Sequence, residues 1–278
     1  MKRMRGPAVF ALVTAVALTL TGCLDTAVKV IVKPDGSGTI EKTVVVSKAL
    51  VEFMKGMGAE GDSEAVEKSL LDEKSLKAQA AVMGSGVTFQ SAVKVSTDKG
   101  NGFKATYGFK DIAKVKIDQN PSGDLNLPAG ASGQAEQSPK EFVTFAFTKG
   151  LPGMPAVLSI SLPRPSKEDT AKARAKVADS SGADAQQMME MLKPLYENLR
   201  IAIGVEVQGR IVETNAAHVQ GSSVTIMDVD FGKVLSDDAM LKKLSASQQS
   251  SLADTMELLK GFPGVIFEPS DRVQVKFR

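Results

Sequence analysis

Few side chains in this sequence of 278 residues could carry out catalysis. His218 is the only histidine, and it lies in a predicted turn. Serine and cysteine hydrolases need an imidazole beside the nucleophile, and no G-x-S-x-G nucleophile elbow is present. Two acidic pairs could act as the carboxylates of a glycosidase: Asp228 with Asp230, and Asp237 with Asp238. Positions on a strand face and at a helix N-terminus explain these pairs better.

The sequence also lacks the patterns that hold metal ions and phosphates. A zinc site needs several histidine or cysteine ligands, and the chain has one of each. No Walker A sequence occurs, and no G-x-G-x-x-G follows a predicted strand. The stretch 35–40 is similar to the middle of an EF-hand loop, but Lys33 and Val44 would occupy the first and last ligand positions. We therefore predict no metal ion, no cofactor and no enzymatic activity.

Cys23 is the only cysteine, and it follows an arrangement typical of export signals. A positively charged start precedes an uncharged apolar run over 8–20, which is shorter than the roughly 20 residues that span a membrane. The four residues Leu20-Thr21-Gly22-Cys23 are similar to the lipobox of bacterial lipoproteins. The resemblance implies cleavage between Gly22 and Cys23, a diacylglycerol on the thiol and an N-acyl chain. An uncleaved membrane anchor and a signal peptide with an incidental cysteine are the alternatives.

Two or three acyl chains would anchor the protein firmly, because each buried methylene contributes roughly 0.8 kcal/mol. We expect residues 1–22 to be the signal peptide and 23–278 to be a single envelope domain. Three of the 34 basic residues lie in the leader, so 31 remain against 32 acidic ones, a balance of about −1. This balance argues against a nucleic-acid partner. The membrane is the expected partner, together with a lipid or an envelope protein.

Alternating apolar residues and turn signals predict a sheet built from hairpins. The expected strand pairs are 26–33 with 39–47, 87–97 with 103–109, 140–148 with 156–162 and 201–213 with 222–231, followed by short strands at 265–267 and 272–277. In the second pair, Phe89, Val93 and Val95 should share one face. A stretch at about 119–139, rich in Gly, Ser and Pro, is predicted to be a flexible loop.

Apolar residues at helical spacing predict helices between these hairpins. The expected helices cover 47–57, 63–83, 167–178, 185–199, 236–244 and 247–260. The predicted fold class is therefore α+β, with an antiparallel β-sheet built from hairpins and packed against several amphipathic helices.

Three further segments resemble the LppM-type family of bacterial lipoproteins. They are the strand-turn-strand at 28–39, the segment 207–215 and the segment 221–225. The chain departs from the family where a Pro-Gly is replaced by Gln208-Gly209, where a tryptophan near Met227 is missing, and where a C-terminal membrane helix has no counterpart. The resemblance implies an envelope domain of mixed α and β structure that binds a lipid or lipid-like ligand. It carries over no catalytic residue.

The aromatic residues of two predicted hairpins are the candidate ligand-binding residues: Phe103, Tyr107, Phe109, Phe145 and Phe147. If the sheet and helices close over them completely, they form only a core. If the layers stay partly open, they line an apolar pocket for an acyl chain. We expect a membrane-anchored, non-enzymatic lipoprotein that binds an apolar ligand or a protein partner. A lipid-anchored hydrolase that uses carboxylates and a purely structural assembly factor are the alternatives.

The residue after the cysteine bears on the membrane that receives the protein. Residue 24 is Leu and not Asp, so the enterobacterial sorting pattern predicts the outer membrane, with the domain facing the periplasm.

Overall fold

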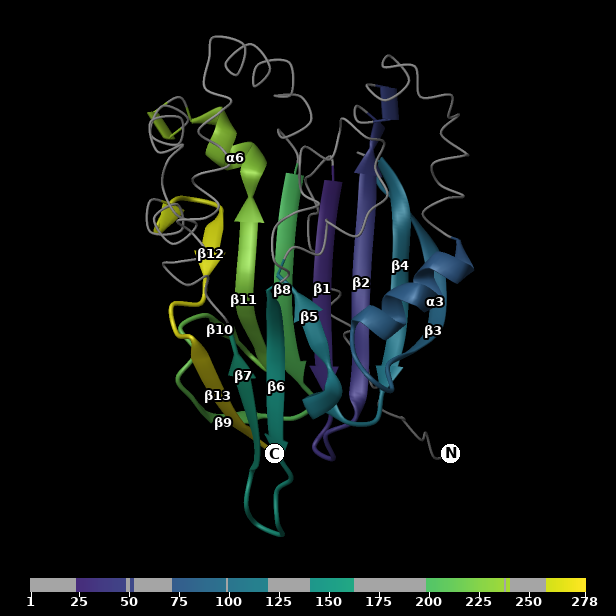
Figure 1. Ribbon diagram of the computed structural model, residues 1–278. Coiled ribbons are helices and arrows are strands. Elements are labelled where there is room, and N and C mark those ends of the chain that lie inside the picture. The colour runs from purple at the N-terminus through teal and green to yellow at the C-terminus, as the bar shows by residue number, and fades with distance from the viewer. Residues whose placement is uncertain are drawn as a thin grey trace, which may run out of the picture.

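The computed structural model describes residues 24–48, 51–52, 72–98, 100–119, 141–162, 199–237, 239–240 and 259–278. Strands make up 56% of the described residues and helices 15%. The strands form two sheets that lie one over the other (Figure 1). In this part of the chain, no helix is long and apolar enough to cross a membrane.

The larger sheet has eight strands in the order β10-β11-β8-β1-β2-β4-β3, with β12 paired to β11. Their bounds are β1 Leu24–Val32, β2 Gly38–Ser47, β3 Thr88–Ser96, β4 Gly100–Phe109, β8 Leu199–Val207, β10 Val219–Gln220, β11 Ser223–Asp230 and β12 Val265–Phe267. The predicted hairpins β1–β2 and β3–β4 are confirmed as antiparallel pairs. In contrast, β1 pairs in parallel with β8, in a register that places Leu24 beside Leu199.

The smaller sheet has five strands in the order β5-β6-β7-β13-β9. Their bounds are β5 Lys116–Asp118, β6 Phe142–Thr148, β7 Ala156–Ser161, β9 Ile211–Thr214 and β13 Arg272–Phe277. The predicted strand 201–213 is split between the two sheets at Gly209, whose φ of 152° is positive. A Cβ at Gly209 would lie 2.1 Å from the carbonyl oxygen of Arg278, so only glycine fits this crossing point.

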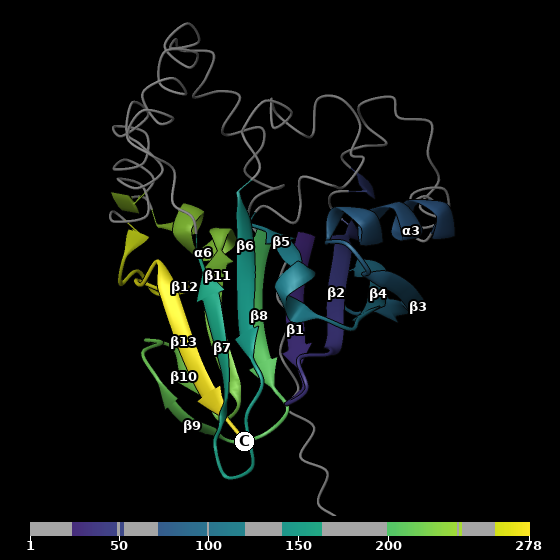
Figure 2. The ribbon, with the colours of Figure 1, turned by 60° about the horizontal axis from the view of Figure 1, so that its bottom comes forward.

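The α+β prediction is wrong, because a second sheet covers most of the face that helices were expected to cover. The described residues contain two α-helices, α3 Glu73–Val82 and α6 Phe231–Ser236, and a 3₁₀ turn, η1 Ile112–Lys114. Figure 2 shows the smaller sheet in front of β11, β8 and β1, and α3 beside it over β2, β4 and β3. A second sheet buries the same apolar strand faces that amphipathic helices would bury.

Residues 73–82 of the predicted 63–83 helix form α3, and residues 63–71 of that prediction lie outside the described ranges. The expected helix at 167–178 lies outside the described residues. So do most of those at 47–57, 185–199, 236–244 and 247–260, although Leu259 is helical. The predicted flexible loop also lies outside them, except at its first residue.

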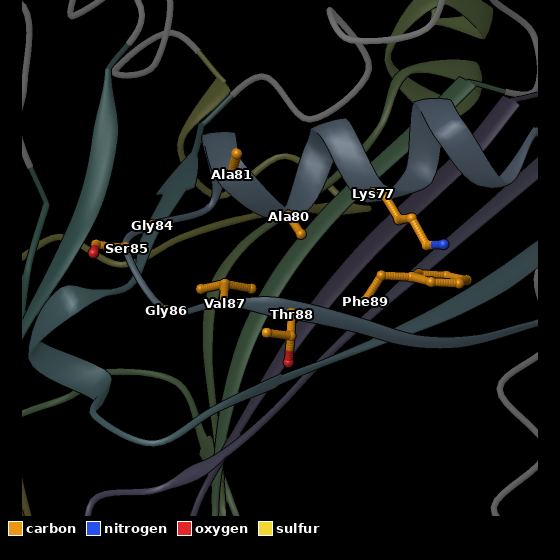
Figure 3. A pocket seen from close by; sticks show the side chains of 9 residues that line it. All are labelled: Lys77, Ala80, Ala81, Gly84, Ser85, Gly86, Val87, Thr88 and Phe89. Atoms are coloured by element: carbon orange, nitrogen blue, oxygen red, sulfur yellow. The ribbon is translucent and has the colours of Figure 1, made fainter.

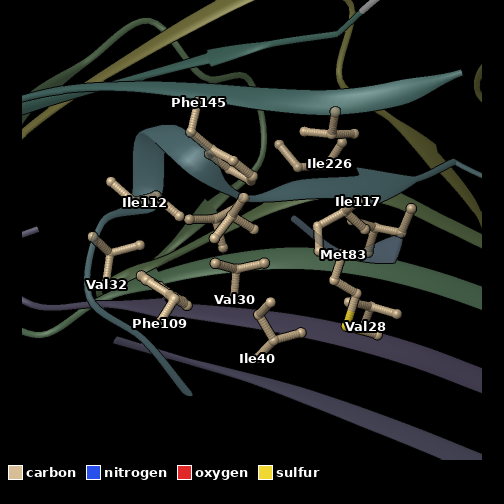
Figure 4. Close-up of a cluster of buried hydrophobic side chains, with 14 of the residues drawn as sticks. Val28, Val30, Val32, Ile40, Met83, Phe109, Ile112, Ile117, Phe145 and Ile226 are labelled. Carbon is tan, nitrogen blue, oxygen red and sulfur yellow. The ribbon is translucent and has the colours of Figure 1, made fainter. Parts of the chain in front are cut away.

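One large apolar cluster fills the space between the two sheets and beneath α3 (Figure 4). Val30, Val32 and Ile40 of the larger sheet are fully buried in it, together with Ile160 and Val275 of the smaller sheet. Burial of apolar surface contributes about 25 cal/mol per Å², so this continuous cluster is the main stabilising feature of the fold.

The predicted alternation along β3 is interrupted by a β-bulge. The register with β4 shifts between Phe89 and Ser91, which places two residues of β3 opposite a single step of β4. Beyond the bulge the faces exchange, so Ala92 faces Ala105 of the core and Val93 lies 57% exposed. The prediction that Phe89, Val93 and Val95 share one face is therefore wrong.

Candidate functional site

The α3 helix forms one wall of the candidate site and is positioned by its caps and its apolar face. Its N-cap, Asp72, accepts hydrogen bonds of 2.9 Å from both the backbone N–H and the hydroxyl of Ser75. These bonds, the backbone one first, hold the pKa of Asp72 below its ordinary value of 3.8. Leu76 and Ala80 are buried on the side that faces the sheet. The helix therefore lies against the sheet by an apolar stripe, with a fixed beginning.

Two glycines return the chain from α3 to β3. Gly84 and Gly86 both have positive φ, and the carbonyl oxygen of Lys114 lies 2.1 Å from where a Cβ of Gly84 would be. The backbone N–H of Lys116 donates to the carbonyl of Met83 at 2.8 Å, which ties the end of the helix to β5 of the smaller sheet. This tight reversal sets α3 and β3 side by side with a gap between them.

The gap is an open groove of about 490 Å³ between α3 and the beginning of β3 (Figure 3). Its apolar wall includes Ala80, Val87 and Phe89, and Lys77 lies at its mouth. The ring of Phe89 packs edge-on against Tyr107, with centroids 5.8 Å apart. Lys77 forms an exposed ion pair of 2.6 Å with Glu73, so its ammonium group is accessible to solvent. The groove thus combines an apolar wall with a charged rim.

A buried lysine lies beneath the same helix. Lys42 of β2 is 1% exposed, and its Nζ donates a hydrogen bond of 3.3 Å to Oε1 of Gln79 in α3. Fully buried lysines are rare unless they have a partner. Lys42 is not among the candidate residues predicted from the sequence. Its strand parity with the buried Ile40 and Val44 nevertheless indicates an inward side chain.

Four of the five predicted ligand-binding residues lie inside the apolar cluster. Phe103, Tyr107, Phe109 and Phe145 are buried, and Phe147 is half-buried, with its ring 6.4 Å from that of Phe277. Tyr107 does not line the groove itself, but its ring packs against Phe89, which does. Phe145 and Phe147 belong to β6, in the other sheet. Their role in ligand binding stays a prediction. Gly22 and Cys23 lie outside the described residues, and β1 begins at the next residue.

Of the two acidic pairs, Asp228, Asp230 and Asp237 occupy structural positions on the larger sheet and at helix ends. Both oxygens of Asp228 accept hydrogen bonds from the Arg200 guanidinium, at 2.8 and 2.7 Å. These bonds raise the pKa of Arg200 against the opposing effect of burial, and the charges of Asp25 and Asp230 add to them. Asp230 caps α6 by accepting from the N–H of Lys233 at 3.1 Å.

The remaining candidates for chemistry do not gather at one place. Asp237 accepts from the N–H of Met240 at 2.8 Å, as a residue before a helix does, and Asp238 lies outside the described ranges. His218 is half-buried in the turn between β9 and β10. Across the described ranges, no three His, Cys, Asp or Glu side chains are grouped closely enough to hold a metal ion.

Comparison with known proteins gives a distant likeness. No protein-family model matches the chain, and no curated protein matches it. Among solved structures, it is weakly similar to the folded domain of the Mycobacterium tuberculosis LppM protein, which was determined by NMR. The identity is 10%, the TM-score is 0.30, and the alignment covers 76% of this chain and 85% of that one. An overlap this loose assigns neither a fold family nor an activity.

Proposed function

We propose that this chain is a non-enzymatic lipoprotein of the bacterial cell envelope, held in a membrane by lipid on Cys23, and that it binds an apolar, lipid-like ligand in the α3–β3 groove. The groove is the observation that carries the ligand class. Its volume of about 490 Å³ falls within the range of small-molecule sites, roughly 300–1,000 Å³. An acyl chain would contact Ala80, Val87 and Phe89, and its headgroup would lie at the mouth near Lys77.

The apolar character of the groove also favours binding over hydrolysis. The described residues that line it include one charged side chain, Lys77, and no carboxylate. A hydrolase that uses two carboxylates would therefore need another site, and Asp228 and Asp230 already bind Arg200 and cap α6.

The tether is supported by the sequence Leu20-Thr21-Gly22-Cys23. With β1 beginning one residue after the cysteine, the lipid would hold the end of the larger sheet close to the bilayer surface. Leu24, in place of the Asp that retains enterobacterial lipoproteins, favours the outer membrane and a domain that faces the periplasm.

Cys23→Ala tests the tether. The variant should accumulate as an unlipidated precursor that is not cleaved after Gly22, because the thiol that receives the diacylglycerol is missing. Intact-mass measurement and labelling with a fatty-acid probe would show this. A variant that is still labelled, or still cleaved at the same bond, would overturn the lipoprotein assignment. Recovery of the wild-type protein in the inner membrane would overturn the proposed location.

A matched pair of helix variants tests the groove. Ala81 lines the groove from an exposed position of α3, whereas Ala78 is exposed on the same helix outside it. Ala81→Trp should weaken binding of the fluorescent fatty acid cis-parinaric acid by about tenfold, because the indole would displace about two methylene groups worth roughly 0.8 kcal/mol each. Ala78→Trp should leave the affinity unchanged. A wild-type chain that does not bind the probe would overturn the ligand class and favour an assembly role.

A further inference from the structure

The turn between β6 and β7 holds two large apolar side chains in solvent. Leu151 is 67% exposed and Met154 is 62% exposed, more than the other exposed large apolar residues of the described chain. The N–H of Met154 donates to the carbonyl of Leu151 at 2.8 Å, across Pro152 and Gly153 with its φ of 82°. This is the pattern of a type II turn. Because this hydrogen bond closes the turn, Leu151 and Met154 lie close together at its two ends.

The turn lies at the extreme end of the molecule. Figures 1 and 2 both show the β6–β7 connection reaching beyond the ends of the neighbouring strands. A shallow groove of about 260 Å³ at its base is lined by residues that include Pro34, Lys149, Met154 and Arg278. The β1–β2 turn therefore lies at the same end, whereas Leu24 begins β1 at the other end. A strand of nine residues separates the two ends by about 30 Å.

Basic side chains are more numerous than acidic ones at this end. Exposed basic side chains include Lys33, Lys110, Lys149, Arg210 and Arg278, and exposed acidic ones include Asp35, Asp111 and Glu213, of which Glu213 pairs with Lys276. The groove residues place Lys149 and Arg278 beside the tip. Arg210 and Arg278 exchange backbone hydrogen bonds of 2.8 and 3.1 Å, and Lys110 follows the pair Gly38–Phe109. This end of the molecule therefore combines an exposed apolar turn with an excess of basic side chains.

We propose that the β6–β7 tip, residues 149–155, docks onto an anionic lipid surface, with Leu151 and Met154 inserted among the acyl chains and the basic side chains facing lipid phosphates. Two side chains on a narrow turn offer far less area than the roughly 800 Å² per partner of a stable protein interface. Shallow membrane insertion needs only a few large apolar groups and nearby positive charge.

The direction of docking rests on the proposed function. If Cys23 holds the Leu24 end of β1 at one membrane, the tip faces away from that membrane and contacts a second lipid surface. The protein would then bridge two bilayers. The tip itself does not depend on the anchor, so the two proposals can fail separately.

Because the chain has no tryptophan, Leu151→Trp supplies a clean reporter of insertion. The full-length chain is reconstituted in phosphatidylcholine vesicles, and acceptor vesicles that contain phosphatidylglycerol are added. The emission of the Leu151→Trp chain should shift to shorter wavelength. Val93→Trp, on an exposed apolar position of β3, is the matched control and should not shift. An unchanged Leu151→Trp spectrum, or equal shifts in both variants, would overturn the proposal.

Capture of the acceptor vesicles tests the bridge. Leu151→Asp should reduce capture by about tenfold. Burial of a carboxylate among the acyl chains is unfavourable, and the anionic bilayer surface repels it. Salt at 1 M should weaken capture, because the Debye length falls to about 3 Å. Equal capture of pure phosphatidylcholine vesicles would overturn the role of charge. Intact-mass measurement shows whether Cys23 is lipidated. If it is not, the proposed lipid tether is refuted. The emission shift of Leu151→Trp with free anionic vesicles then still tests whether the β6–β7 tip inserts into a membrane.

Discussion

Replacement of Phe145 by Ala should destabilise the protein strongly, because this ring lies between the two sheets. Phe145 is 6% exposed and belongs to the apolar cluster that includes Val32, Ile112 and Phe109 (Figure 4). A buried phenylalanine removes at least about 150 Å² from water, which corresponds to about 4 kcal/mol at 25 cal/mol per Å². The Cβ that alanine retains lowers this figure, and the cavity left behind raises it. We expect a loss of about 3–5 kcal/mol in the free energy of unfolding.

Urea denaturation of the chain from Leu24 to Arg278, followed by circular dichroism, measures this loss. Thr148→Ala, at an exposed position of the same strand, is the control and should change the stability by less than about 0.5 kcal/mol. The denaturant slope should be the same in both variants. A loss below about 1 kcal/mol for Phe145→Ala would refute the packing argument. If binding of cis-parinaric acid were lost at the same time, Phe145 would line a ligand cavity and not a closed core.

Three further changes test local features of the fold. Gly36→Ala should lower the free energy of unfolding more than Gly86→Ala. Both glycines have similar positive φ, but a Cβ at Gly36 would lie 2.7 Å from the ring of Phe147, whereas a Cβ at Gly86 would contact nothing. Equal losses of stability in denaturation experiments would contradict this reasoning. Arg200→Met should cost about 2 kcal/mol in the same assay, since it leaves a half-buried carboxylate without its two charged hydrogen bonds, and a loss near zero would show that water replaces them. Asp72→Ala should lower the melting temperature at pH 7. Because the pKa of Asp72 is lower in the folded chain, this stabilisation is present above pH 3.8 and is lost as the pH falls through the folded-state pKa, so the difference from wild type should vanish in acid and not in base.

The candidate site was only partly predictable from the sequence. The aromatic residues of the hairpins were expected to gather, and Phe103, Tyr107 and Phe145 do lie in one cluster. The groove itself lies elsewhere, where Gly84 and Gly86 turn the chain between α3 and β3. Its shape depends on how closely a helix approaches an edge strand. No periodicity within either segment records that distance.

The bulge in β3 shows a second kind of failure. Simple alternation placed Phe89 and Val93 on one face, but the extra residue at the bulge exchanges the faces beyond it. A bulge depends on the fit between two paired strands, so the sequence of one strand contains little sign of it. The buried Lys42 is the opposite case, because its parity with Ile40 and Val44 already indicated an inward side chain.

The sequence by itself determined the features that depend on neighbouring residues. These are the hairpins β1–β2 and β6–β7 with their glycine and proline turns. The lipid-bearing Cys23 is also predicted from the sequence alone and still awaits its test. Only the tertiary structure decided which layer covers the apolar strand faces. The parallel pairing of Leu24 with Leu199 and the transfer of β9 to the smaller sheet join residues far apart in the chain. An apolar strand face is buried equally well by a helix or by another sheet, so its pattern cannot distinguish the two.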